Sequence, residues 1–240
     1  MPSPRLSVVV PAFNEGAVLE AHLQLLVEFL ARRGEEFEIL CVDDGSSDDT
    51  AAILNRLGPR VRTLVHRENL GKGAAVRTGS LAATGERVVF LDADLSTELS
   101  DLEPLLAALD AGADVALGSR RVGGAGIEVR QPATREFLGR CFSGIARALV
   151  APEVLDFTCG FKGFRREAAH QIFSCARVNR WAFDAEIIAI ARARGLRIVQ
   201  VPVRWRHCAG SKVHVFGAAS GALAALGMIV GRRLLGSYRR

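Results

Sequence analysis

The sequence predicts an α/β fold in which a mostly parallel central sheet is flanked by helices and followed by an apolar helical segment at the C-terminus. Along the first half, short apolar runs rich in β-branched residues alternate with amphipathic stretches, which is the pattern of successive βα units. The chain has 240 residues, of which 49% are hydrophobic and 24% charged. This length and composition predict one folded domain with a single large core.

Each expected strand is a short apolar run, and each expected helix has apolar residues that recur on one face. In the first helix this face includes Leu19, Leu23 and Leu30, and Ser47 offers an N-cap oxygen to the second. The expected strands are Leu6–Val10, Glu38–Val42, Val61–His66, Arg87–Leu91, Asp114–Gly118 and Arg197–Val201. The expected helices are Ala17–Arg33, Asp49–Leu57, Gly73–Ala83, Leu99–Ala111, Thr134–Val150 and Asp184–Ala193.

The second half is less regular. The basic, glycine-rich stretch Arg120–Gly126 predicts a mobile loop, and Asp156–Phe164 is expected to be irregular.

Residues 1–212 are expected to form one domain, and residues 213–240 a separate C-terminal segment. Residues 213–231 carry no formal charge and arginines follow, so the segment could span a membrane, lie on its surface, or pack in the core or a homodimer. We expect a helix lying on the membrane surface, with the arginines at anionic head groups.

The net charge of +5 and the sequence pI of about 9.3 indicate an anionic partner. No basic recognition helix, RNA-binding aromatic motif or zinc-finger spacing is present, so nucleic acid is not expected. The five cysteines are scattered, odd in number and without a C-x-x-C pair, which fits reduced thiols. With no signal peptide apparent, we expect a cytoplasmic protein peripherally associated with the cytoplasmic face of a membrane.

Polar residues follow three of the expected strands. Because ligands bind at the carboxyl ends of parallel strands, these residues are the first site candidates. Asp43 and Asp44 suit either a turn with a helix cap or hydrogen bonds to a base edge or ribose hydroxyls, and Asn14 and Glu15 allow the same two interpretations. Their occurrence together favours ligand contact. The three strand-end sequences are Pro11–Glu15, Asp43–Asp48 and Asp92–Asp94.

The third strand end, Asp92-Ala93-Asp94, is a candidate metal site. Alternation along an extended strand would place both carboxylates on one side, where they can hold a divalent cation that bridges a diphosphate. A calcium-binding loop is the structural alternative. It is disfavoured because Thr97 replaces the glycine that the loop requires and because a strand, Arg87–Leu91, is expected before Asp92.

Gly71-Lys72-Gly73 brings a lysine to the start of a helix, which suits an anionic group. The alternative is that the glycines allow close packing and that the lysine is exposed. The spacing matches neither a P-loop nor the dinucleotide-binding G-x-G-x-x-G pattern.

Taken in order, these motifs resemble family 2 glycosyltransferases of the GT-A fold. Motifs of the second half resemble the dolichyl-phosphate β-glucosyltransferase branch, and the resemblance extends from about Leu6 to Lys212. The first group comprises Val9–Glu15, Val42–Asp48, Gly71–Gly73, Asp92–Asp94 and Gly118–Arg120. The second group comprises Asp156–Lys162, Arg180–Glu186 and Gly210–Lys212.

The resemblance implies a nucleotide-sugar donor, with UDP-glucose favoured over GDP-mannose, and Mg²⁺ or Mn²⁺ bound by Asp92 and Asp94. Ser96 stands where related mannosyl enzymes often carry a glutamine that contacts the metal. The residues expected around the donor are Pro11, Asn14, Glu15, Asp43, Asp44, Lys72, Asp92 and Ala93.

The expected reaction is inverting transfer of a hexose to a polyprenyl phosphate. Such an acceptor is already anionic and needs positioning more than deprotonation, a task that suits arginine. The candidates for binding its phosphate are Arg120, Arg121, Arg135, Ser211 and Lys212. We also expect Asp94, Arg120 and Arg135 to act in catalysis.

Two other functions stay open. A hydroxyl acceptor, on a polysaccharide or a small molecule, would require a general base. Asp184 is the first candidate and Glu186 the second, although Asp184 could instead cap the helix that it begins. The other alternative is a module that binds a nucleotide sugar or a metal without catalysis.

Overall fold

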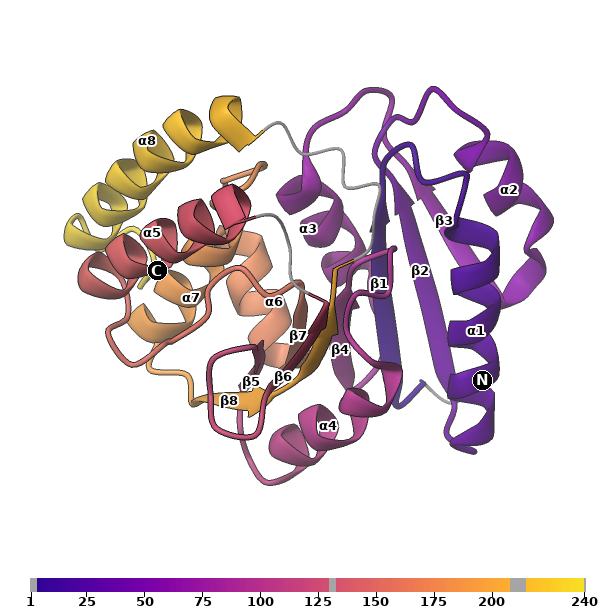
Figure 1. Ribbon diagram of the computed structural model, residues 1–240. Coiled ribbons are helices and arrows are strands. Elements are labelled where there is room, and N and C mark those ends of the chain that lie inside the picture. The colour runs from indigo at the N-terminus through magenta and orange to yellow at the C-terminus, as the bar shows by residue number, and fades with distance from the viewer. Residues whose placement is uncertain (1–3, 130–132, 208–214, 240) are drawn as a thin grey trace.

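The computed structural model describes residues 4–129, 133–207 and 215–239. Its centre is a seven-stranded sheet with the order β3-β2-β1-β4-β7-β5-β8, and β6 and β9 form a separate two-stranded sheet (Figure 1). The strands of the large sheet are β1 (Leu6–Ala12), β2 (Phe37–Asp43), β3 (Val61–Val65), β4 (Arg87–Leu91), β5 (Val115–Ser119), β7 (Phe161–Arg165) and β8 (Ile198–Pro202). Those of the small sheet are β6 (Gly126–Val129) and β9 (Arg204–Arg206).

The mostly parallel α/β fold predicted from the sequence is confirmed, and each of the six expected strands and six expected helices is found within a few residues of its expected place. The helices are α1 (Leu19–Arg32), α2 (Thr50–Arg56), α3 (Lys72–Ala82), α4 (Leu102–Asp110), α5 (Ala133–Leu149), α6 (Arg166–Cys175), α7 (Phe183–Ala193) and α8 (Val215–Leu234).

Four elements, β6, α6, β7 and β9, were not predicted. The stretch expected to be a mobile loop ends in β6, which pairs with β9. The stretch expected to be irregular ends in β7, which lies between β4 and β5 and runs antiparallel to both. That strand contains the polar residues Lys162 and Arg165 and a glycine, and this explains why its sequence lacks the signature of a buried strand.

Strand order creates the crevice at which a ligand can bind. The chain builds β1, β2 and β3 outward and then returns to place β4 on the other side of β1, with Val9 opposite Phe90. The gap between the loops after β1 and β4 is therefore a topological switch point. Since β7 is antiparallel and Phe161 lies opposite Leu91, the residues before β7 reach this same edge.

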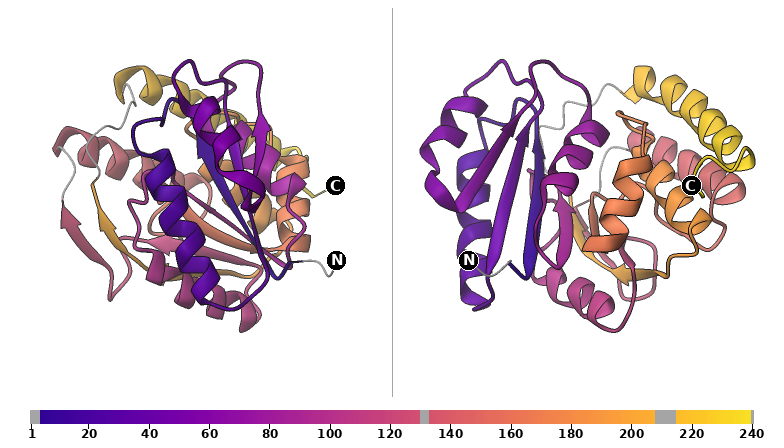
Figure 2. Two further views of the ribbon diagram at one scale, coloured as in Figure 1. Left: turned by 90° about the vertical axis from the view of Figure 1, so that its right-hand side faces the viewer. Right: turned by 180° about the vertical axis from the view of Figure 1, so that it is seen from behind.

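Helices cover both faces of the sheet. Val8 and Val10 of β1 face the cluster that contains α1 and α4, whereas Val9 faces the cluster that contains α3, α6 and α7, as the alternation of a strand requires. An outer layer of α5 and α8 lies beyond α7, and it is at the opposite end of the molecule from α1 and α2 in both Figure 1 and Figure 2.

The C-terminal segment packs on the rest of the chain. Leu226 and Ile229 of α8 are buried in the core, and the buried Tyr238 donates a hydrogen bond from its hydroxyl to Glu186 of α7 at 2.9 Å. Among the residues that the structure describes, no helix has the length and apolar character needed to cross a bilayer. The division at residue 212 and the membrane contact of the segment stay predictions.

Candidate functional site

The loops after β1 and β2 are joined into one unit. Asn14 has a left-handed backbone (φ 56°), and its amide N–H donates to Oγ of Ser46 at 2.9 Å. In return, Oδ1 of Asn14 accepts the amide of Ser47 at 2.8 Å, and the amide of Glu15 donates to Oγ1 of Thr50 at 2.9 Å. These contacts fix the polar residues of both strand ends, and contact of Asn14 or Glu15 with a nucleoside stays a prediction.

Pro11 belongs to β1 and is buried. Its missing N–H is tolerated because the pairing of β1 with β4 ends at Val9, while pairing with β2 continues. Pro11 thereby lies at the point where the edge of β1 becomes open toward β4, which is where a ligand would approach.

Asp44 is a buried carboxylate with three donors in the protein. Oδ1 accepts from Nδ1 of His66 at 2.6 Å and from the amide of Leu70 at 3.1 Å, and Oδ2 accepts from the amide of Gly71 at 2.7 Å. Asp43 is also buried, and its Oδ1 accepts the amide of Ser46 at 3.0 Å. Both carboxylates therefore hold the neighbouring loops through hydrogen bonds within the protein. Contact with a nucleoside stays a prediction for each.

Lys72 begins α3 and faces the acidic strand end. Its ammonium forms an ion pair with Asp92. Burial alone would lower the pKa of Lys72, but the nearby carboxylates of Asp92 and Asp184 raise it on balance. The preceding Gly71 has φ 106°, and a Cβ there would lie 2.6 Å from the carbonyl oxygen of Asn179, so close packing also requires this glycine.

The Asp92–Asp94 sequence forms a turn, which corrects the expectation of an extended strand. β4 ends at Leu91, the amide of Leu95 donates to the carbonyl of Asp92 at 3.1 Å, and Leu95 has φ 48°. Because a strand and not a helix precedes the turn, the calcium-loop alternative is wrong. The carbonyl of Ala93 accepts from Nδ1 of His22 at 2.8 Å, which ties the turn to α1.

The residues of this turn fit a hard divalent cation. Asp92 and Asp94 supply carboxylate oxygens, the ligands that Mg²⁺ and Mn²⁺ prefer. Gly160 lies against one of them, since a Cβ there would be 2.1 Å from Oδ2 of Asp92. Within the described residues no cluster of three or more His, Cys, Asp or Glu side chains could hold a metal, and the two carboxylates of this turn would be the side chains that hold a cation here.

Arg120 is held by the loop that precedes β7. Nε and Nη2 bind the two carboxylate oxygens of Asp156 at 2.8 and 2.9 Å, and Nη2 also binds Oγ1 of Thr158 at 2.9 Å. Burial alone would raise the pKa of the Asp156 carboxyl, but the bonds from Arg120 lower it to about 2. The guanidinium lies 5.2 Å from the ring centre of Trp205. Arg120 is therefore first a partner of Asp156, and its contact with a phosphate stays a prediction.

The other phosphate candidates lie differently. Arg121 is exposed and its Nη1 donates to the carbonyl of Leu155 at 3.2 Å. Partial desolvation and the neighbouring arginines 120, 140 and 147 lower its pKa, so Arg121 belongs to a basic surface that includes the middle and the last turn of α5. Arg135 lies in α5, but its side chain is outside the described part of the chain, as are Ser211 and Lys212.

Asp184 does not cap its helix, which corrects that alternative. It lies in the first turn of α7 and its Oδ1 accepts a hydrogen bond from Nζ of the buried Lys162 at 2.5 Å. Burial raises the pKa of Asp184, although Lys162 and Lys72 oppose the shift.

Glu186 is fully buried and accepts hydrogen bonds from the amides of Arg177 and Val178 and from the hydroxyl of Tyr238. It therefore cannot reach an acceptor, and the expectation that it could serve as a base is wrong.

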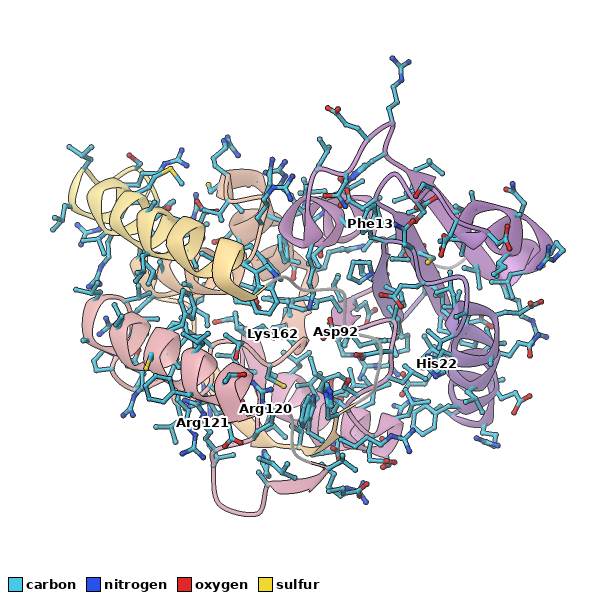
Figure 3. All side chains as sticks on the ribbon, turned by 45° about the horizontal axis from the view of Figure 1, so that its top comes forward. Phe13, His22, Asp92, Arg120, Arg121 and Lys162 are labelled. Atoms are coloured by element: carbon cyan, nitrogen blue, oxygen red, sulfur yellow. The ribbon has the colours of Figure 1, made fainter. Side chains whose placement is uncertain are left out.

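The Asp156–Gly160 loop and Lys162, to which the sequence assigned no individual role, also belong to the site. Figure 3 shows Asp92 and Lys162 between the two halves of the molecule, with Arg120 and Arg121 below them and His22 toward α1. The Asp156–Gly160 loop supplies the partners of Arg120 and the space for Asp92. Because β7 is antiparallel to β4, the residues before it lie at the same edge of the sheet as the residues after β4. The sequence would have placed this loop at the site only if β7 had been predicted as an antiparallel strand.

Known proteins resemble this chain over most of its length. The profile described as "Glycosyl transferase family 2" matches residues 7–173. A dolichyl-phosphate beta-glucosyltransferase of Trichomonas vaginalis is 37% identical over 87% of this chain and 66% of its own length. One of Drosophila melanogaster is 35% identical over 99% of this chain and 78% of its own length. The chain thus spans about two thirds of the first relative and over three quarters of the second.

Among solved structures, the fold is similar to that of glucosyl-3-phosphoglycerate synthase from Mycobacterium tuberculosis in complex with Mn²⁺, UDP and glucosyl-3-phosphoglycerate. The TM-score is 0.66 at 23% identity, with 95% of this chain and 80% of that one covered. Together with the profile match over most of the chain, the fold and the acidic turn at the switch point lead to one conclusion: this chain belongs to glycosyl transferase family 2.

Proposed function

We propose that this glycosyltransferase transfers a hexose, with glucose as the first candidate, from a UDP-sugar to a polyprenyl phosphate with inversion at the sugar. The observation that carries the donor half is the Asp92–Asp94 turn at the switch point, faced by the ammonium of Lys72. The named relatives, which are dolichyl-phosphate beta-glucosyltransferases, support glucose and a lipid phosphate as the substrates.

Asp92 and Asp94 would hold Mg²⁺ or Mn²⁺, and such an ion would supply Lewis-acid stabilisation of the leaving diphosphate. Lys72 pairs with Asp92 and would bind a diphosphate oxygen of the donor. Phe13 follows β1 with 38% of its surface exposed, and its ring offers a stacking surface for the base. Gly160 leaves the space that the Asp92 carboxylate occupies.

The acceptor half supports a phosphate over a hydroxyl. A hydroxyl acceptor needs a base, and Asp184 has its carboxylate paired with Lys162 at 2.5 Å. A phosphate acceptor needs no base, only cationic groups that position it. The basic surface formed by Arg121, Arg140 and Arg147 meets that need.

We also propose that the outer layer of α5 and α8 attaches the protein to an anionic membrane surface, where a polyprenyl acceptor lies. α8 contains no acidic residue, and both helices expose apolar side chains beside arginines, as a surface-bound helix does. Arg232 is excluded from this role because it turns inward to Glu186. The exposed apolar residues are Phe137, Ile145 and Leu149 on α5, Leu223, Met228 and Leu234 on α8, and Leu235 directly after α8.

The decisive experiment is a donor screen with Mn²⁺ or Mg²⁺ and a short polyprenyl phosphate, in which transfer of labelled sugar to lipid is measured. We expect transfer from UDP-glucose, and a loss of about 1000-fold or more in Asp92→Ala and Asp94→Ala. Asp110→Ala, which changes an exposed carboxylate at the far end of α4, is the control. Transfer to a soluble hydroxyl acceptor alone would refute the lipid-phosphate proposal, and donor binding without any transfer would favour a binding module.

Membrane attachment is tested separately by co-sedimentation with phosphatidylcholine vesicles with and without phosphatidylglycerol. We expect binding only to the anionic vesicles, weakened in Leu234→Ser/Leu235→Ser. Equal binding of this variant and the wild type would contradict the assignment of the α8 end.

A further inference from the structure

Lys162 is an ammonium group inside the core of the protein. It lies in β7, opposite Phe90 of β4 and Leu117 of β5, and its side chain is fully buried. A buried charge is far less favourable than an apolar side chain of similar size unless it is completely paired. The contacts of the ammonium must therefore account for a lysine at this position.

All three N–H groups of the ammonium have acceptors. Nζ donates to the carbonyl oxygens of Phe157 at 3.1 Å and Cys159 at 2.5 Å, and to Oδ1 of Asp184 at 2.5 Å. It also lies 5.4 Å from the ring centre of Phe90. Since the two carbonyls belong to the loop before β7 and Asp184 belongs to α7, Lys162 joins this loop to the helix.

The Asp156–Gly160 loop carries contacts to both halves of the site. Its Asp156 and Thr158 bind the guanidinium of Arg120, and its Gly160 provides the space that Asp92 occupies. A shift of the loop would displace Arg120 and Asp92 together. The group that fixes the loop carbonyls is therefore placed to control both.

We propose that Lys162 is a positioning residue for glycosyl transfer: its ammonium holds the Asp156–Gly160 loop and Asp184 in one arrangement, and Asp184 is its counter-ion and not a general base. The inference rests on the proposed function, because a phosphate acceptor needs no base. Lys162 touches neither substrate in this account and acts through Arg120, Asp92 and Asp184.

The first test is NMR of the lysine ammonium groups, which is practical because the chain contains only Lys72, Lys162 and Lys212 as lysines. We expect one ammonium signal with slow hydrogen exchange, absent in Lys162→Met and shifted in Asp184→Asn. A wild-type protein without such a signal, or a signal that Asp184→Asn leaves unchanged, would overturn the pairing. This measurement needs no acceptor, so its outcome is independent of the proposed function.

The second test separates positioning from a merely structural role by kinetics with UDP-glucose, Mn²⁺ and a short polyprenyl phosphate. In Lys162→Met we expect kcat/KM for the acceptor to fall about 100-fold, the loss that a displacement of about 1 Å causes. The Kd for UDP in the presence of Mn²⁺ is expected to rise as well, because Asp92 shifts with the loop. The matched control is Phe173→Leu, which changes a buried residue of the same core that packs on Phe164. If Phe173→Leu loses as much kcat/KM as Lys162→Met at the same loss of Tm, Lys162 acts only through the stability of the core and the proposal is wrong.

Asp184→Asn decides the role of the carboxylate. The amide oxygen can still accept a hydrogen bond from Lys162, so we expect a loss of kcat below about 100-fold, the smallest loss expected when a general base is removed. A larger loss with the Lys162 signal still protected would identify Asp184 as a base and overturn the proposal. If the wild type transfers nothing to polyprenyl phosphate, the proposed function fails, and NMR still decides the pairing.

Discussion

The two sides of the site are built by strands that run in opposite directions, and this determines where their residues lie in the sequence. On the donor side, β1, β2 and β4 are parallel, so the residues directly after each strand reach the edge of the sheet. On the loop side, which comprises Asp156–Gly160 and Arg120, β7 is antiparallel. There Asp156–Gly160, directly before β7, reach the same edge, and Arg120 reaches it directly after β5.

The two sides are also held together differently. The donor side relies largely on backbone amides that donate to side-chain oxygens, as at Asp44, while Asp92 stays partly exposed. The loop side relies on two buried ion pairs, Arg120–Asp156 and Lys162–Asp184. Because a buried charge without its partner is strongly destabilising, we expect substitutions on the loop side to change stability as well as activity, and those of Asp92 or Asp94 to change activity alone.

The largest effect on stability is expected for Asp156→Ala, which leaves the guanidinium of Arg120 without its carboxylate. Removal of one partner of a buried pair predicts a loss of about 4 kcal/mol in the free energy of unfolding, measured by urea denaturation. The matched control is Asp110→Ala, which removes a 60% exposed partner of Arg87 while Glu35 remains as its second partner. A loss below about 1 kcal/mol is expected there. Equal losses in the two variants would contradict the contrast between the sides.

The sequence predicted the donor side well because its signals are local. A β-branched run followed by polar residues indicates both a buried strand and its ligand-binding end, as for Val88–Asp92. The geometry of the acidic turn was not predictable in this way, since Leu95 adopts a left-handed backbone that its residue type does not favour.

The loop side could not be predicted from local pattern because its contacts join residues far apart in the chain. Arg120 and Asp156 are 36 positions apart, and Lys162 and Asp184 are 22 apart. The polar Lys162 interrupts the apolar pattern of β7, and only its burial against Asp184 and two carbonyls makes it compatible with the middle of a sheet. The pairing that satisfies it is a property of the tertiary fold.

The Arg120–Asp156 pair gives the stability of the protein a pH dependence. The pKa of Asp156 is about 2 in the folded protein, below the value of about 4 of an unfolded aspartate. Its contribution to the free energy of unfolding, about 3 kcal/mol, is therefore fully present above about pH 4 and is lost as pH falls through about 2. We expect the difference in unfolding free energy between the wild type and Asp156→Asn to narrow over this range. A difference that stays constant with pH would show that the charge of Asp156 is not the source of its effect.

A smaller effect is expected where the two sides touch, at Gly160. A Cβ there would lie 2.1 Å from Oδ2 of Asp92, so Gly160→Ala must turn the carboxylate away from its present position. We expect the affinity for Mn²⁺ in the presence of UDP to fall about tenfold, measured by calorimetry, with little change in Tm. Gly139→Ala is the control, because no heavy atom lies within 4 Å of a Cβ built at that glycine. Unchanged Mn²⁺ affinity in Gly160→Ala would separate the loop from the metal site.

The smallest effect is expected at the C-terminus, far from both sides of the site along the chain. Tyr238→Phe keeps the buried ring and removes one hydrogen bond to Glu186, which retains the amides of Arg177 and Val178. We expect a loss of about 1 to 2 kcal/mol in the free energy of unfolding, with kcat and KM unchanged and with the exposed Ser237→Ala as the control. If Tyr238→Phe alters the kinetics without altering stability, the C-terminal segment contributes to the site itself. If Tyr238→Phe lowers only the stability, the C-terminal segment serves to stabilise the position of α7, which is the role that the buried contact between Tyr238 and Glu186 predicts.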